Sequence, residues 1–152
     1  MSMNRRSGKV HWMGVTTIVA LVLVLGLIFK QGDTPSAGAA RFMKALAAGD
    51  VDQLTENSFL DGLSEQELKQ QWTTTVKDYL PHFLFLYTFT TEETNSDKLA
   101  TVKMRYRPEL DNDSGYERNL GVQLELVNGR WKVDIGSIDR EIVPALPTTL
   151  NK

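Results

Sequence analysis

The spacing of hydrophobic positions changes twice along the chain. Residues 10–29 are almost uninterruptedly apolar, residues 35–80 place apolar side chains three or four positions apart, and residues 83–135 alternate apolar with polar side chains. A long apolar run is typical of a membrane span, the second spacing of amphipathic helices, and the alternation of strands. The pattern predicts an α+β fold class, with an N-terminal transmembrane helix followed by helices and then strands.

The apolar run has the features of a single membrane-spanning helix over residues 10–30. At about 1.5 Å per residue it reaches roughly 30 Å, the thickness of a bilayer core. Trp12 lies at the N-terminal edge, where an indole suits the headgroup layer, and Lys30 closes the other end. Because Arg5, Arg6 and Lys9 precede the run, the positive-inside rule predicts a cytoplasmic N-terminus over residues 1–9.

A cleavable signal peptide is the alternative for this segment. Ala37-Gly38-Ala39 offers a cleavage site of the A-x-A type. The apolar run is longer than the hydrophobic region of such peptides, and Lys30 and Asp33 separate it from the site. We therefore expect a retained anchor in the inner (cytoplasmic) membrane, with cleavage after Ala39 left open. Under both alternatives the following domain is exported, to the periplasm or its equivalent.

Helix-boundary residues mark the start of the exported domain. Residues 31–35 form a polar linker, and the domain itself is expected over residues 36–140. Thr34 and Pro35 suit the N-cap and first position of a helix that ends at Gly49. Asp50 can cap a second, short helix.

A third helix has the clearest signal. Ser64 and Glu67 have the spacing of a capping box. Leu68, Trp72 and Val76 then recur every four residues, and Tyr79 or Leu80 continues this apolar stripe. Pro81 is expected to end the helix.

Beyond Pro81 the alternation predicts four antiparallel strands. The first strand has apolar residues on both faces and is expected to be buried on both sides. Asn128-Gly129 between the last two strands is a strong hairpin signal, and turn clusters at residues 95–97 and 111–115 join the earlier ones. We expect a meander sheet packed on the three helices.

The last residues are predicted to form an extended C-terminal tail over residues 141–152. Pro144 and Pro147 disfavour a regular helix and a central strand. The apolar residues of the tail are expected to dock on the parent domain or to make a partner contact. They are Ile142, Val143, Leu146 and Leu150.

Charge is distributed unevenly between these parts. Residues 1–30 contain four basic residues and no acidic one, whereas the remaining residues contain the other 13 basic and all 19 acidic residues. The acidic domain argues against nucleic acid as a partner. The chain has no cysteine, which excludes disulfides, thiolate metal ligands and a cysteine nucleophile.

The order of three helices followed by four strands resembles the NTF2-like, or cystatin-like, α+β superfamily. The residues that carry this resemblance are the first helix ending "FMKALAAGD" at Asp50 and the closing "NGRWKVDIGSI" that begins at Asn128. The resemblance implies a curved sheet wrapped around a long helix to form a cone. A single N-terminal span before such a domain is also similar to the layout of the VirB8-like bitopic assembly proteins.

Enzymes of this superfamily hold an acid/base pair inside the cone, commonly aspartate with histidine or tyrosine. His82 is the available histidine, because His11 lies in the predicted span, and the nearest acids are Asp50 and Asp78. Asp50 is better explained as a helix cap and Asp78 as a solvent-facing residue. We therefore predict no catalytic site, metal site or cofactor.

The remaining candidate is a binding pocket in the cone. Its possible lining residues are aromatic: Trp72, Tyr79, Tyr87, Tyr106 and Trp131. The sequence thus favours a non-catalytic accessory subunit of a larger membrane protein complex, with the lipid bilayer and other subunits as partners. A small-molecule or peptide-binding module is the alternative, and an NTF2-like enzyme is a third.

Overall fold

The computed structural model describes residues 33–79, 85–108 and 117–149. The chain divides into two compact units between Gly32 and Asp33, and the second unit is described here. The predicted span over residues 10–30 lies outside the described residues, as do its flanking Arg5, Arg6, Lys9, Trp12 and Lys30. In the part of the chain that is described, no helix is both long and apolar enough to cross a membrane.

The first helix begins and ends at the predicted caps. Helix α2 (Pro35–Ala48) starts after Thr34, whose hydroxyl accepts the Ala37 N–H at 3.2 Å, and it ends at Gly49 with φ 65°. Glycine is suited to this left-handed conformation because it has no Cβ.

The next two helices also have the predicted caps. Helix α3 (Val51–Asn57) is capped by the Asp50 carboxylate, which accepts the Gln53 N–H at 3.0 Å. Helix α4 (Glu65–Tyr79) begins with the capping box: the Ser64 N–H donates to the Glu67 carboxylate at 2.9 Å, and the Glu67 N–H donates to Ser64 Oγ at 3.3 Å.

The sheet contains the predicted antiparallel meander and one additional strand. The meander consists of β2 (Phe85–Ser96), β3 (Leu99–Pro108), β4 (Arg118–Val127) and β5 (Arg130–Asp134). The β4–β5 turn places Asn128 at φ 52° and Gly129 at φ 79°. Both angles are positive, as a two-residue hairpin with a type I′ turn requires. A short 3₁₀ helix (Ile135–Ser137) follows β5.

The prediction of a four-stranded sheet was wrong, because a fifth strand, β1 (Ser58–Phe59), pairs with β5 in parallel. The strand order is β1-β5-β4-β3-β2. A two-residue strand is too short to show an alternation of apolar and polar positions, which explains why the sequence pattern did not reveal it.

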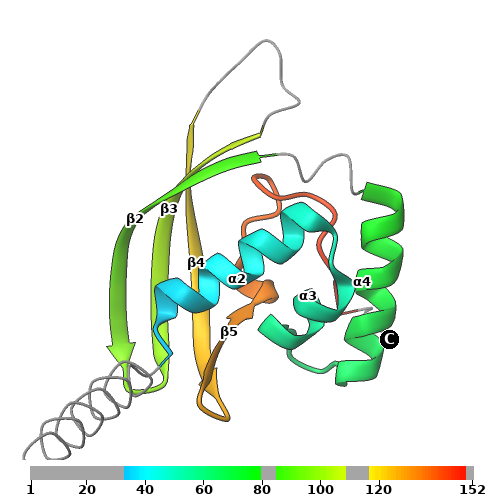
Figure 1. The fold of residues 1–152 in the computed structure, drawn as a ribbon, viewed down its shortest axis with the longest axis horizontal. Coiled ribbons are helices and arrows are strands. Elements are labelled where there is room, and N and C mark those ends of the chain that lie inside the picture. Colours follow the sequence, from blue (N-terminus) through cyan, green and yellow to red (C-terminus); the bar gives the residue numbers. More distant parts are fainter. Residues whose placement is uncertain (1–32, 80–84, 109–116, 150–152) are drawn as a thin grey trace, which may run out of the picture. The chain divides into compact units, whose positions relative to one another are not determined.

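The three helices lie on one side of the sheet, and α2 crosses it (Figure 1). The core forms between α2, α4 and the inner face of the strands. Its fully buried large side chains include Phe42, Trp72, Met104, Tyr106 and Leu120. The α+β class and the three helices were therefore predicted correctly.

Strand β2 is not buried on both sides, which corrects the expectation for the first meander strand. Leu86 is 52% exposed, whereas Phe85 is buried and Tyr87 is half-buried. The described helices α2, α3 and α4 cover one face of the sheet, and Leu86 points to the other face.

Residues on both sides of the predicted domain pack with it. Asp33 and Thr34, expected in the linker, already belong to the compact unit. In the predicted tail, Val143 and Leu146 are 1% and 3% exposed and form part of the domain's own core, while Ile142 packs against it. Leu150 lies outside the described residues.

Candidate interaction surface

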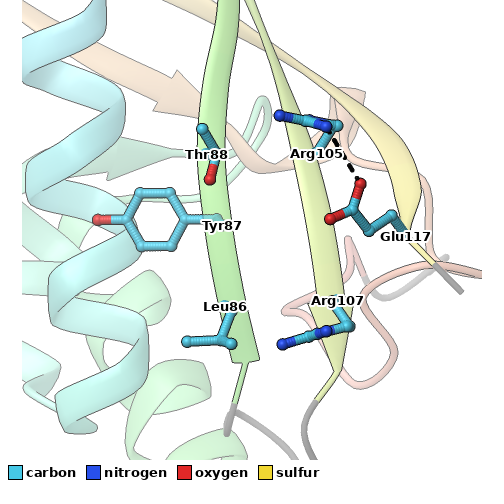
Figure 2. Close-up of a pocket in the computed structure, with 6 residues that line it drawn as sticks. All are labelled: Leu86, Tyr87, Thr88, Arg105, Arg107 and Glu117. Atoms are coloured by element: carbon cyan, nitrogen blue, oxygen red, sulfur yellow. Dashed lines mark hydrogen bonds and ion pairs between the residues drawn. The ribbon is translucent and has the colours of Figure 1, made fainter. Parts of the chain in front are cut away.

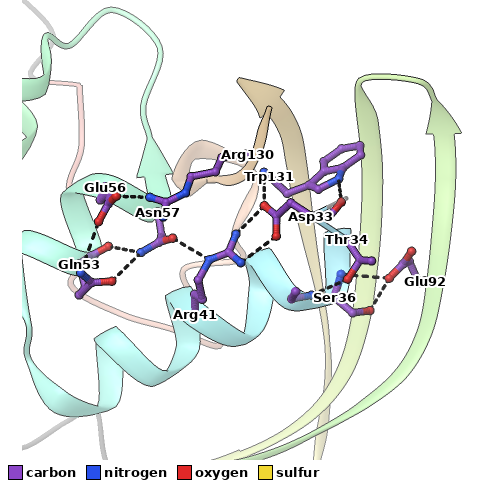
Figure 3. A network of polar contacts seen from close by, with 11 residues as sticks. Asp33, Thr34, Ser36, Arg41, Gln53, Glu56, Asn57, Glu92, Arg130 and Trp131 are labelled. Carbon is purple, nitrogen blue, oxygen red and sulfur yellow. Dashed lines mark hydrogen bonds and ion pairs between the residues drawn. The ribbon is translucent and has the colours of Figure 1, made fainter. Parts of the chain in front are cut away.

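A cluster of polar contacts ties the start of the domain to its last strand. Arg41, on α2, points back to Asp33 and donates from Nη1 and Nη2 to the two carboxylate oxygens at 2.8 and 2.6 Å. The Arg41 Nε donates to Asn57 Oδ1 at 3.0 Å, at the end of α3. We call Asp33, Arg41, Asn57 and Trp131 the junction cluster (Figure 3).

Trp131 completes this cluster from β5. Its backbone N–H donates to Asp33 Oδ2 at 2.8 Å, and its indole Nε1 donates to the Asp33 carbonyl oxygen at 3.1 Å. Both the side chain and the main chain of Asp33 are therefore held. A bidentate guanidinium–carboxylate pair fixes the orientation of the two side chains as well as their distance, so Asp33 has one defined position at the N-terminal end of the domain.

The hydrogen-bonded contact between Asp33 and Arg41 shifts the pKa values of both groups. The Arg41 guanidinium lowers the pKa of Asp33, and the Trp131 N–H acts in the same direction against the opposing effect of burial. The same contact with Asp33 raises the pKa of Arg41 above its ordinary value. Both groups are therefore charged at neutral pH.

Two further contacts extend the cluster to either side. Glu56 on α3 forms an ion pair with Arg130 on β5. At the other side, the Ser36 N–H donates to the Glu92 carboxylate of β2 at 3.0 Å, and the Ser36 hydroxyl contacts the same oxygen. Together with the junction cluster, these two contacts link α2 to α3 and to β2, and α3 to β5.

A small concavity lies on the outer side of the sheet, away from α2. It has a volume of about 180 Å³, and we call it the β2 notch (Figure 2). Its lining residues come from β2, from β3 and from the position just before β4: Leu86, Tyr87, Thr88, Arg105, Arg107 and Glu117. Arg105 donates to the Glu117 carboxylate at 3.4 Å, and both side chains are about half exposed.

The aromatic residues predicted to line a pocket do not share one environment. Trp72 and Tyr106 are 0% and 2% exposed and lie in the core, and Trp131 is largely buried in the junction cluster. Tyr87 is half-buried and borders the β2 notch, whereas Tyr79 is 44% exposed.

Trp72 and Tyr106 are fixed by specific contacts in that core. The Trp72 Nε1 donates to the buried Ser58 Oγ at 3.2 Å, and its ring lies 6.1 Å from that of Phe42. Burial raises the pKa of Tyr106 to about 12, and its ring centroid lies 5.0 Å from that of Phe85. These aromatic side chains fill space in the domain.

The candidate acid/base residues are not brought together. His82 lies outside the described residues, Asp50 caps α3, and Asp78 is exposed on α4. Within residues 33–79, 85–108 and 117–149, no group of three or more histidine, cysteine or acidic side chains has the geometry of a metal site.

Sequence reasoning did not single out the junction cluster or the β2 notch. Arg105 and Arg107 were noted as outward-facing residues of one strand, opposite Glu117 on the next, and Arg105 does contact Glu117. Lys103 instead pairs with Glu93 of β2 at 2.7 Å. The Asp33–Trp131 contact joins residues that are distant in sequence, so no local pattern signals it.

Several solved structures are similar to the chain, at low sequence identity. An NTF2-like protein of unknown function from Shewanella oneidensis MR-1 is 14% identical, with a TM-score of 0.47, over 64% of this chain and 89% of that one. A ketosteroid isomerase-like protein from Erwinia carotovora atroseptica is also 14% identical, with a TM-score of 0.42, over 64% and 86%.

A protein of unknown function with a cystatin-like fold from Nostoc punctiforme is 18% identical, with a TM-score of 0.45, over 74% of this chain and 90% of that one. No protein-family model and no curated protein matches the chain.

Proposed function

We propose that the protein is a single-span, membrane-anchored accessory subunit of a larger membrane protein complex, with an NTF2-like domain outside the cytoplasm. The anchor is the apolar segment of residues 10–30, and its basic flank sets a cytoplasmic N-terminus. The proposal gives the domain a binding and positioning role and assigns it no catalytic residue.

The observation that carries this proposal is the fixation of Asp33, three residues after the end of the proposed anchor. Asp33 is held by Arg41 through its side chain and by Trp131 through both its side chain and its backbone. The first residue of the domain is therefore held against its own last strand, and a domain with such a defined first residue suits a subunit that presents a surface to partners.

The burial of the aromatic residues favours this function over a ligand-binding cone. Trp72 and Tyr106, which the alternative places along a pocket, are packed against Phe42 and Phe85. A ligand at that place would have to displace well-packed side chains, which costs several kcal/mol.

Extraction and purification of the full chain test the proposal in two steps. Alkaline carbonate should leave the protein in the membrane pellet, because a spanning helix is not removed by high pH. Purification in a mild detergent should then recover other membrane proteins in fixed stoichiometry. Release by carbonate, or recovery of the chain alone at native expression levels, would contradict the proposed function.

A further inference from the structure

Among the described residues, strand β2 lies at the edge of the sheet and has no partner strand on its outer side. It is the last strand of the sheet, and within the described residues only β3 pairs with it. The backbone groups along a free edge form a template for another extended segment.

The features that protect an edge strand are confined to the second half of β2. The register with β3 shifts between Phe89 and Thr91 and again between Thr94 and Ser96. Glu92 and Glu93 add negative charge there. Bulges and charges of this kind discourage strand addition, so the regular segment Phe85–Phe89 is the part of the edge suited to pairing.

The side chains beside that segment form the β2 notch. Leu86 is half exposed, and its register partner on β3 is Arg107. Figure 2 shows the Arg107 side chain extending from β3 toward β2. Among the described residues, Glu117 pairs with Arg105, Glu93 pairs with Lys103, and no carboxylate pairs with Arg107.

We propose that the β2 edge at Phe85–Phe89 binds an extended acidic peptide segment of a partner protein. This inference rests on the proposed function and names the surface that a partner uses. The peptide backbone pairs with β2, an apolar side chain covers Leu86, and a glutamate or aspartate side chain forms an ion pair with Arg107.

The spacing of strands in a sheet makes this arrangement possible. An added strand lies about 5 Å from β2 and hence about 10 Å from β3. An arginine and a glutamate side chain together span that distance. A second copy of this chain that pairs symmetrically through Phe85–Phe89 fits less well, because that segment contains no carboxylate to pair with Arg107.

Hydrogen–deuterium exchange on the full chain in dodecyl maltoside tests the proposal. The probe is acetyl-Thr-Glu-Thr-Val-Thr-Glu-Thr-amide, in which the valine and both glutamate side chains lie on the same face of the strand, as the shared face of Leu86 and Arg107 requires. Its counterpart with lysine in place of glutamate is the matched peptide control. The acidic probe should slow exchange at the backbone amides of Phe85–Phe89 and bind at least tenfold more tightly than the lysine peptide.

Two variants test whether the acidic probe binds through Arg107 in the β2 notch or through the positive charge of the surface in general. Arg107→Ala should weaken binding of the acidic probe about tenfold, because it removes the charged partner. Lys103→Ala removes a cation from the same strand face that already has a carboxylate partner, and it should change binding less than twofold. Equal binding by both peptides, protection elsewhere than β2, or equal effects of the two variants would overturn the proposal.

The outcomes distinguish this inference from the proposed function. Failure of the acidic probe to protect β2, with native subunits still recovered in mild detergent, refutes the edge site and leaves the subunit role intact. Dimerisation of the chain that protects β2 without the probe would assign the edge to a second copy and also overturn the proposal.

Discussion

Trp131 donates its backbone N–H to the Asp33 carboxylate at 2.8 Å and its indole N–H to the Asp33 carbonyl oxygen at 3.1 Å, although 98 residues separate them. The two contacts join the first residue of the domain to the last strand of the meander. Arg41 then fixes the same carboxylate from α2. Asp33 thus connects the start of the domain with α2 and with β5.

Asp33→Asn should lower the free energy of unfolding by about 2 kcal/mol. The substitution keeps the size of the side chain but leaves Arg41 without its counter-charge and weakens the bond from the Trp131 N–H. Urea denaturation followed by tryptophan fluorescence measures the change. As a control, Asp52→Asn removes an exposed ion pair with Lys69 and should change the free energy of unfolding far less than Asp33→Asn does. Equal losses in the two variants would contradict a special role for Asp33.

The lowered pKa of Asp33 predicts a specific dependence of stability on pH. Its folded-state pKa lies below the ordinary value of an aspartate, so the native state binds fewer protons than the unfolded state near that pH. The stabilisation is fully present above the unfolded pKa and is lost as the pH falls through the lowered folded pKa. Urea midpoints measured from about pH 5 downward should therefore fall less steeply for Asp33→Asn than for the unaltered protein. Parallel curves would show that Asp33 does not contribute to acid sensitivity.

Gly38→Ala should destabilise the domain by about 1–3 kcal/mol, although alanine is the better helix former. A Cβ at Gly38 would lie 2.6 Å from the Trp131 carbonyl oxygen and 2.8 Å from its Cβ, so α2 would have to move away from β5. Thermal unfolding followed by circular dichroism measures the loss. Gly121→Ala is the matched control, because a Cβ at that exposed strand position meets nothing within 4 Å. A Gly38→Ala protein as stable as the control would refute the close approach.

Local features of this fold were predictable because their causes lie within a few residues of one another. The Thr34, Asp50 and Ser64 caps each bond to a backbone N–H three residues later, and the Asn128-Gly129 turn depends on its own two residues. Such interactions leave a direct signal in the sequence, and the structure confirms them.

The remaining features depend on which segments meet in space. The alternation in β2 identified its apolar residues, but the exposure of Leu86 depends on which face of the sheet the helices α2, α3 and α4 cover. The β2 notch requires the register of β2, β3 and β4, and the Asp33–Trp131 contact requires the whole domain to be folded. The short strand β1 is defined only by its pairing with β5.

The final prediction concerns the segment after the last strand, which Arg140 holds in place. Its Nη1 and Nη2 donate to the carbonyl oxygens of Leu146 and Pro147, each at 2.7 Å. These bonds close a turn in which Ala145 has φ 66°, and they keep Val143 and Leu146 in the core. Arg140→Ala should therefore lower the free energy of unfolding by about 1–2 kcal/mol.

The loss should be concentrated in that segment, because Arg140 bonds to two of its carbonyl groups. Hydrogen–deuterium exchange of residues 143–149 should accelerate in Arg140→Ala, while exchange in β3 and β4 stays unchanged. Arg118→Ala is the matched control, since Arg118 donates one exposed bond to the Glu141 carbonyl oxygen at 3.0 Å and should have the smaller effect. If exchange of residues 143–149 is the same in both variants and in the unaltered protein, the buried Val143 and Leu146 side chains hold the segment without help from Arg140.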